Sequence, residues 1–133
     1  MKEEEIKKKL SKEEYEVLRE GKTEAPFTGE LLKNKKEGLY KCKVCGSELF
    51  SSKDKFDSGT GWPSFSNIVS NKNIETKRDS KFGMERVEVL CKNCGSHLGH
   101  VFPDGPKEKG GNRYCINSVC LDFEAKSQIP ADK

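Results

Sequence analysis

Polar and apolar residues alternate along several short stretches of this chain, which is the pattern of strands that bury one face. The clearest stretch is 86–91, Arg-Val-Glu-Val-Leu-Cys. Comparable extended patterns predict further strands at 39–42, 48–50, 98–102 and 113–123. Residues 105–112 contain three glycines and a proline, so this segment is predicted to be a loop. Together these patterns predict a mainly β domain.

Near the N-terminus the pattern changes to that of a short helix. Ser11 and Glu14 have the spacing of a capping box, in which each side chain bonds the backbone N–H of the other residue. Tyr15 and Leu18 then share one helix face, and Gly21 can end the helix in the left-handed conformation. The surrounding lysines and glutamates indicate a solvated face.

Composition narrows the class of protein. The chain has 133 residues, of which 32% are hydrophobic and 35% charged, so it can form one domain with a modest core. The net charge of +3 comes from interleaved lysine and glutamate, not from the basic stripe that nucleic-acid binding needs. We find no transmembrane stretch and no secretory signal. We therefore expect a monomeric cytoplasmic protein with no nucleic-acid or membrane partner.

Four of the six cysteines form two Cys-x-x-Cys pairs, Cys42 with Cys45 and Cys91 with Cys94. This spacing predicts one tetrahedral structural zinc site, with Zn²⁺ joining two adjacent hairpin turns. The alternative is a pair of redox-active dithiols. Such dithiols usually open a helix after a strand, and that pattern is not visible here.

Cys115 stands outside these pairs and is the candidate nucleophile. Arg113, Cys115 and Asn117 alternate along the predicted 113–123 strand, so their side chains share one face. On that face the guanidinium of Arg113 can favour the thiolate, and the amide of Asn117 offers a hydrogen bond. The alternative is that Cys115 is an inert buried thiol.

Two histidines, His97 and His100, follow the second cysteine pair. They could supply protons near neutral pH, or one of them could replace a cysteine as a zinc ligand. Trp62 lies in a turn with Phe65 close behind, and this pair is either core or the wall of an apolar pocket. Asp104 is by default a turn residue.

Three motifs in this order resemble the B-type methionine sulfoxide reductases: Gly-Trp-Pro-Ser-Phe at 61–65, Cys-Gly-Ser-His-Leu-Gly-His-Val-Phe at 94–102, and Arg-Tyr-Cys-Ile-Asn-Ser at 113–118. Members of that family reduce the R epimer of methionine sulfoxide, mostly in proteins, and so repair oxidised proteins. The resemblance implies two antiparallel sheets joined by the four-cysteine zinc site. Together with the residue patterns at both ends, it leads us to expect a helical N-terminal arm at 1–24, a single catalytic domain at 25–124 and a loosely ordered tail at 125–133.

The resemblance also implies a role for each candidate residue. Cys115 would attack the sulfoxide sulfur, release methionine and become a sulfenic acid. His97 and His100, with Asp104 acting through water, would bind and protonate the sulfoxide oxygen. The other implied roles are an apolar pocket at Trp62 for the substrate methyl group, stabilisation of the thiolate by Arg113, hydrogen bonding by Asn117, and zinc binding by Cys42, Cys45, Cys91 and Cys94. Phe65, close behind Trp62, stays a candidate for the same substrate wall.

One position departs from the family. Many members have a cysteine where this chain has Thr60, and that cysteine resolves the sulfenic acid by forming a disulfide with the nucleophile. Cys120 is the remaining thiol, but in one extended strand it would lie about 16 Å from Cys115 on the opposite face. Because that is beyond disulfide reach, we expect thioredoxin or another external thiol to reduce the sulfenic acid.

Two other functions remain open from the residues alone. A zinc-stapled β module could bind a protein or nucleic acid, with Cys115 incidental. A thiol peroxidase or redox sensor could use Cys115 against peroxide.

Overall fold

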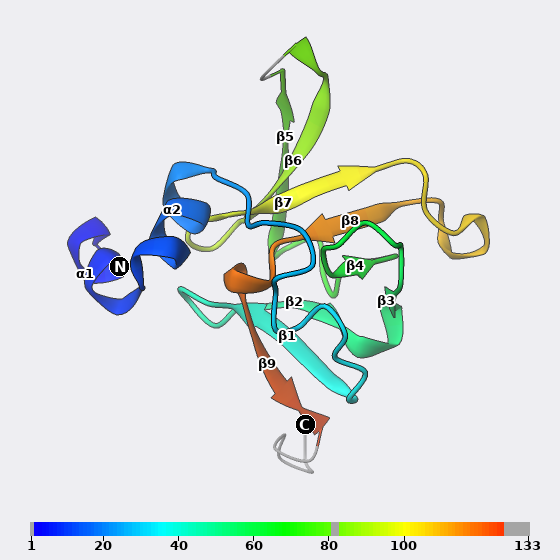
Figure 1. The fold of residues 1–133 in the computed structure, drawn as a ribbon, viewed down its shortest axis with the longest axis horizontal. Helices are drawn as coiled ribbons and strands as arrows, with labels where there is room; N and C mark the ends of the chain where they lie inside the picture. The colour runs from blue at the N-terminus through cyan, green and yellow to red at the C-terminus, as the bar shows by residue number, and fades with distance from the viewer. Residues whose placement is uncertain (1, 81–82, 127–133) are drawn as a thin grey trace.

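The computed structural model describes residues 2–80 and 83–126, and it consists mainly of two antiparallel sheets (Figure 1). The three-stranded sheet has the order β2 (Glu48–Ser51), β1 (Gly38–Cys42), β9 (Leu121–Ala125). The six-stranded sheet has the order β3 (Lys55–Phe56), β4 (Ser64–Phe65), β8 (Arg113–Ile116), β7 (His97–Phe102), β6 (Arg86–Cys91), β5 (Ile74–Asp79). The predicted fold of two antiparallel sheets is confirmed.

The N-terminal segment forms two helices, α1 (Glu3–Lys9) and α2 (Lys12–Glu20), whereas the sequence pattern predicted only one. The capping box at the start of α2 is confirmed. Ser11 Oγ accepts from the Glu14 N–H at 3.1 Å, and Glu14 Oε1 accepts from the Ser11 N–H at 2.8 Å. Gly21, with φ 76°, ends α2 as predicted.

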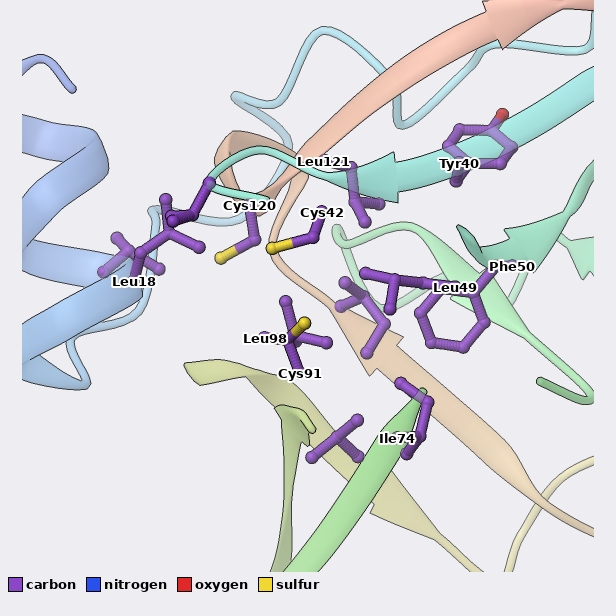
Figure 2. Packing of buried hydrophobic residues seen from close by; sticks show 14 of the residues in the cluster. Leu18, Tyr40, Cys42, Leu49, Phe50, Ile74, Cys91, Leu98, Cys120 and Leu121 are labelled. Atoms are coloured by element: carbon purple, nitrogen blue, oxygen red, sulfur yellow. The ribbon is translucent and has the colours of Figure 1, made fainter. Parts of the chain in front are cut away.

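Both helices pack onto the β domain and share its core. Three of their apolar side chains, Ile6, Val17 and Leu18, are buried together with the sheet residues, and so is Leu10 between the two helices. Figure 2 shows Leu18 facing Cys120 and Cys42 in this cluster. Polar contacts fix the helices as well, since Arg19 Nη1 donates to the Cys94 carbonyl at 2.8 Å and Lys9 Nζ donates to the Val44 carbonyl at 2.7 Å. The helical arm therefore rests directly on the two cysteine turns.

The predicted strand over 113–123 is wrong, because the chain changes sheet within it. Strand β8 ends at Ile116, a 3₁₀ helix spans Ser118–Cys120, and β9 then joins the other sheet. At the break, the side chain of Asn117 donates to the Leu98 carbonyl at 3.0 Å. The 16 Å separation of Cys115 and Cys120 rested on one extended strand, and that premise no longer holds.

Strand β5 was not predicted, because its sequence does not alternate. Only Ile74 of its six residues is buried, and most of the others are charged and exposed. Its one strand neighbour is β6, so β5 is an edge strand, where charged side chains discourage pairing with other chains. Figure 1 shows the β5–β6 hairpin extending beyond the rest of the molecule.

The predicted C-terminal tail begins too early, since Ala125 pairs with Gly38 as the last residue of β9. Residues 127–133 of that tail lie outside the described residues. Among the residues that the structure describes, neither α1 nor α2 nor any other helix has the length and apolar character that a membrane crossing requires.

Candidate active site and metal centre

The four paired cysteines come together between the two sheets. Their sulfur atoms all lie within 4.8 Å of one another, with 3.6 Å between Cys42 and Cys94 and 3.5 Å between Cys45 and Cys91. Four thiolates around a metal ion at about 2.3 Å form a tetrahedron with edges of about 3.8 Å. The cluster therefore fits a tetrahedral metal ion.

Two equivalent turns build this cluster. The Gly46 N–H donates to the Cys42 carbonyl at 2.9 Å, and the Gly95 N–H donates to the Cys91 carbonyl at 2.7 Å. Both glycines have positive φ, 79° and 77°, which explains why glycine follows each pair. Among the described residues the cluster contains no histidine, so the alternative of a histidine ligand is not supported.

The crowded thiols change one another's proton affinity. The hydrogen bond with Cys42 lowers the pKa of Cys91, but the hydrogen bond with Cys94 and burial raise it to about 11. Hydrogen bonds with Cys91 and Cys94, together with burial, raise the pKa of Cys42 still further. Hydrogen bonds from Cys42 and Cys91 lower the pKa of Cys94 well below its usual range. Four sulfurs held this closely cannot all be anionic without a cation among them, which is what a metal ion would supply.

Cys115 lies on β8, in the middle of the six-stranded sheet, opposite Ser64 on β4 and His100 on β7. It lines a pocket of about 200 Å³. Six residues that the sequence singled out line this pocket together: Thr60, Trp62, His100, Arg113, Cys115 and Asn117. The pocket therefore combines an indole wall, a thiol and several hydrogen-bond donors.

The surroundings of Cys115 keep it a thiol. Burial raises its pKa above the ordinary value, although Thr60 and Arg113 both act in the opposite direction. The Thr60 hydroxyl lies 3.9 Å from the sulfur. Arg113 thus favours the thiolate as expected, but burial outweighs it, so at neutral pH Cys115 is mainly protonated in the free protein.

Arg113 owes its position to two further contacts. Its guanidinium lies over the Phe102 ring, 4.4 Å from the centroid. It also donates two hydrogen bonds to Asp104, at 2.8 and 3.2 Å. The exposed carboxylate of Asp104 therefore acts on Arg113, and it weakens the effect of the guanidinium charge on the thiol. These contacts of Asp104 are with Arg113, and its implied role beside the histidines stays a prediction.

The two histidines lie side by side because of an irregularity in β7. His97 pairs with Leu90 and Gly99 pairs with Val89, so Leu98 is an extra residue between them. Such a bulge shifts the alternation of side chains and lets residues three apart share a face. The ring centroids are 5.5 Å apart, but only His100 lines the Cys115 pocket.

Each histidine bonds to a carboxylate. His97 Nδ1 lies 2.7 Å from Glu88 Oε2, and His100 Nε2 lies 2.9 Å from Asp79 Oδ2. These partners on β6 and β5 fix the orientation of the rings. Both rings are buried, with His97 5% and His100 9% exposed, but of the two only His100 lines the Cys115 pocket.

Residues 10–125 match the SelR domain family, which covers most of the chain. The peptide methionine sulfoxide reductase MsrB of Methanosarcina barkeri is 55% identical over 126 residues, which are 95% of this chain and 88% of that protein. The MsrB proteins of Methanosarcina mazei and Leifsonia xyli are each 52% identical, over 98% and 94% of this chain and 93% and 90% of their own length. The chain belongs to the MsrB family. It is therefore an oxidoreductase, and the resemblance of its three motifs is confirmed.

In this MsrB-family chain the expectation that Phe65 helps to form an apolar substrate wall is wrong. Phe65 is fully buried and stacks on Phe50, with ring centroids 4.4 Å apart. It pairs with Tyr114, while its neighbour Ser64 pairs with Cys115, so alternation along β4 turns Phe65 to the core. Trp62, by contrast, does line the Cys115 pocket.

Glu24 is a residue of the MsrB site that the sequence did not indicate. Its carbonyl accepts from Trp62 Nε1 at 3.0 Å, and its N–H donates to Asn117 Oδ1 at 3.0 Å. Its carboxyl oxygen Oε1 accepts from the Val119 N–H at 2.9 Å, in the 3₁₀ helix that follows β8. Glu24 is 4% exposed, and this burial raises its pKa. No local signal could have identified it, since its hydrogen-bond partners lie 38 to 95 residues away along the chain.

Proposed function

We propose that this protein reduces the R epimer of methionine sulfoxide to methionine, preferentially in peptides and proteins. The observation that supports this most directly is the position of Cys115 in a pocket with an indole on one side and His100 and Arg113 among its other walls. Its relatives carry the name peptide methionine sulfoxide reductase, which agrees with that chemistry.

In the proposed reaction the sulfur of Cys115 attacks the sulfoxide sulfur. The sulfur–oxygen bond of the substrate breaks, the oxygen moves to Cys115, and the thiol becomes a sulfenic acid as methionine leaves. Cys115 is oxidised by two electrons and the substrate sulfur is reduced by two, so this step needs no other reductant.

Protons are supplied within the pocket. The sulfoxide oxygen is a poor leaving group until it accepts a proton, and His100, which lines the pocket, would donate one. Because Cys115 is a thiol in the free protein, its own proton balances the step: one proton leaves the sulfur and one reaches the oxygen. Arg113 then favours the thiolate as it forms.

The pocket gives a physical reason for choosing one epimer. A sulfoxide sulfur is chiral, with a methyl group, an oxygen and the rest of the side chain as its substituents. The Trp62 ring suits the methyl group, while the polar side chains suit the oxygen. Only one configuration satisfies both while it exposes the sulfur to Cys115, and the family resemblance identifies that configuration as R.

The sulfenic acid is proposed to be reduced by an external thiol. Thr60 lies beside Cys115 and cannot form a disulfide. Cys120 is fully buried in the core, and its sulfur donates to the His97 carbonyl at 3.3 Å. A thiol of thioredoxin would attack the sulfenic sulfur, release water and form a mixed disulfide, which the second thioredoxin thiol then breaks.

We propose that Cys42, Cys45, Cys91 and Cys94 hold a structural Zn²⁺, which would contribute to folding and leave no position open for substrate. The relevant compartment would be the reducing cytoplasm. The protein would be a monomer, with a helical arm at 1–24 before a single catalytic domain that includes all of β9. Elemental analysis of the purified protein should give one zinc per chain, and a clearly lower content in folded, active protein would contradict the assignment.

The decisive test is turnover of separated R and S epimers of a methionine-sulfoxide peptide, with excess dithiol and chromatographic analysis of the products. We expect conversion of the R epimer alone, and none with Cys115→Ser. Conversion of neither epimer by folded, zinc-loaded protein would contradict the proposal. Peroxide consumption in parallel would show whether Cys115 acts as a peroxidase instead.

A further inference from the structure

A second hollow, of about 780 Å³, adjoins the Cys115 pocket and plays no part in the chemistry proposed above. Trp62 lines both hollows, so the larger one begins where the methionine side chain would enter. Its walls come from Phe27 and residues 32–35 in the segment between α2 and β1, and from residues 55–59. In Figure 1 the segment between α2 and β1 has neither helix nor strand. The size lies within the range of about 300–1,000 Å³ that is usual for ligand sites.

This hollow is positively charged. Three lysines line it, Lys33, Lys35 and Lys55, against a single acidic residue, Asp57. Lys33 and Lys35 are exposed, whereas Lys55 is half-buried and donates to the Leu32 carbonyl at 2.7 Å. Burial lowers the pKa of Lys55; the charge of Asp57 acts in the opposite direction, and the charge of Lys35 lowers the pKa further by a smaller amount. A carboxylate entering the hollow would meet three lysines and one acidic residue.

An exposed aromatic ring stands at the rim of the hollow. Phe27 is 67% exposed and has φ 65°, a left-handed conformation that costs a non-glycine residue on the order of 1–3 kcal/mol. Its N–H donates to the Gly61 carbonyl at 2.7 Å, which holds the strained turn in place. A Cβ at Gly61 would lie 3.0 Å from the Phe27 ring, so glycine allows this close approach beside Trp62. A strained backbone that presents an aromatic ring to solvent suggests a contact surface.

We propose that this hollow, here called the basic groove (Phe27, Lys33, Lys35, Lys55 and Trp62), binds the polypeptide that flanks the oxidised methionine and favours flanking aspartate or glutamate. The inference rests on the proposed reductase function. It adds a prediction of which oxidised methionines in a protein the enzyme reduces best. The occupant is substrate polypeptide, because the groove continues from the pocket that holds the methionine side chain and its charge is opposite to that of an acidic segment.

The test uses a series of peptides that carry R-methionine sulfoxide at the centre and differ only in the flanking residues. Each peptide carries two adjacent glutamates, two glutamines or two lysines, placed either directly before or directly after the oxidised methionine. A small dithiol is the reductant throughout. We expect kcat/KM for the best glutamate peptide to exceed that for its lysine counterpart by about 3- to 10-fold. The difference should lie in KM, since the groove binds ground and transition states alike, and it should shrink at high salt.

Charge reversal locates the effect. Lys33→Glu with Lys35→Glu should abolish or invert the preference while leaving turnover of blocked methionine R-sulfoxide unchanged. The matched control is Lys72→Glu with Lys77→Glu, an equal change of charge at exposed lysines that do not line the groove. This control pair should keep the wild-type preference.

Three results would overturn the inference. The wild type could be indifferent to flanking charge, or the control pair could change the preference as much as the groove pair does. The groove pair could also slow thioredoxin-dependent turnover alone, which would make the groove a reductant-docking surface. Failure of the proposed function looks different, because then even blocked methionine R-sulfoxide would not be reduced.

Discussion

Glu24 forms hydrogen bonds with Trp62, Asn117 and Val119 around the active site. Comparing two substitutions of Glu24 can separate the effect of its hydrogen bond from the effect of its charge. The informative pair of variants is Glu24→Ala and Glu24→Gln. Backbone atoms of Glu24 hold Trp62 and Asn117, so those two hydrogen bonds can survive either change. The side chain alone accepts from the Val119 N–H, at 2.9 Å. Alanine removes this acceptor, whereas the amide oxygen of glutamine keeps it.

The magnitude follows from that single bond. A buried N–H that loses its acceptor costs about 1–3 kcal/mol. We therefore expect Glu24→Ala to lower the free energy of unfolding by that amount, which corresponds to a fall in Tm of roughly 3–10 °C for a chain of this size. Since the 3₁₀ helix directly follows the strand that carries Cys115, kcat/KM should fall as well. Glu24→Gln should retain most of both.

The pH dependence distinguishes the two variants further. Burial raises the pKa of Glu24 above its ordinary value of 4.5, so the folded protein holds this proton more tightly than the unfolded chain does. Stability from that proton is fully present below about pH 4.5 and is lost as the pH rises through the folded-state pKa. Glutamine does not titrate, so the stability of Glu24→Gln relative to wild type should rise over this window.

The assay is chemical unfolding of the wild type and both variants at several pH values, with kcat/KM measured on the same preparations. If Glu24→Gln were as damaging as Glu24→Ala at every pH, the hydrogen bond to Val119 would not be the reason for the effect. A constant difference between wild type and Glu24→Gln across pH would likewise refute the raised pKa.

Two further outcomes test the chemistry at Cys115. Thr60→Cys puts a thiol beside the nucleophile, so the two cysteines should form a disulfide after reaction with substrate. Intact mass after one equivalent of substrate without reductant should fall by two hydrogens in this variant, whereas the wild type gains one oxygen. A gain of one oxygen in both proteins would show that residue 60 cannot reach Cys115. Arg113→Gln removes a cation that lowers the pKa of Cys115, so the pH midpoint of Cys115 alkylation should move upward. A midpoint that stays in place or moves downward would contradict that electrostatic role.

Features that depend on near neighbours in the sequence were predicted correctly. The two Cys-x-x-Cys turns each close on a glycine of positive φ, and a spacing of two residues is enough to specify this local geometry. The capping box at Ser11 likewise involves residues only three apart. Alternation predicted strand β6, and the motifs around Trp62 and Cys115 pointed to the family.

Features that depend on distant contacts were decided by the tertiary structure. The break after β8 forms where the Asn117 side chain bonds the Leu98 carbonyl, and no pattern within 113–123 reveals that partner. A bulge set by pairing with β6 places His100 at the pocket, which His97 does not line. Phe65 turned to the core because its neighbour Ser64 pairs with Cys115. Residue types and short spacings determine which chemistry a chain can perform, whereas the face, burial and partner of each side chain depend on segments that only folding brings together.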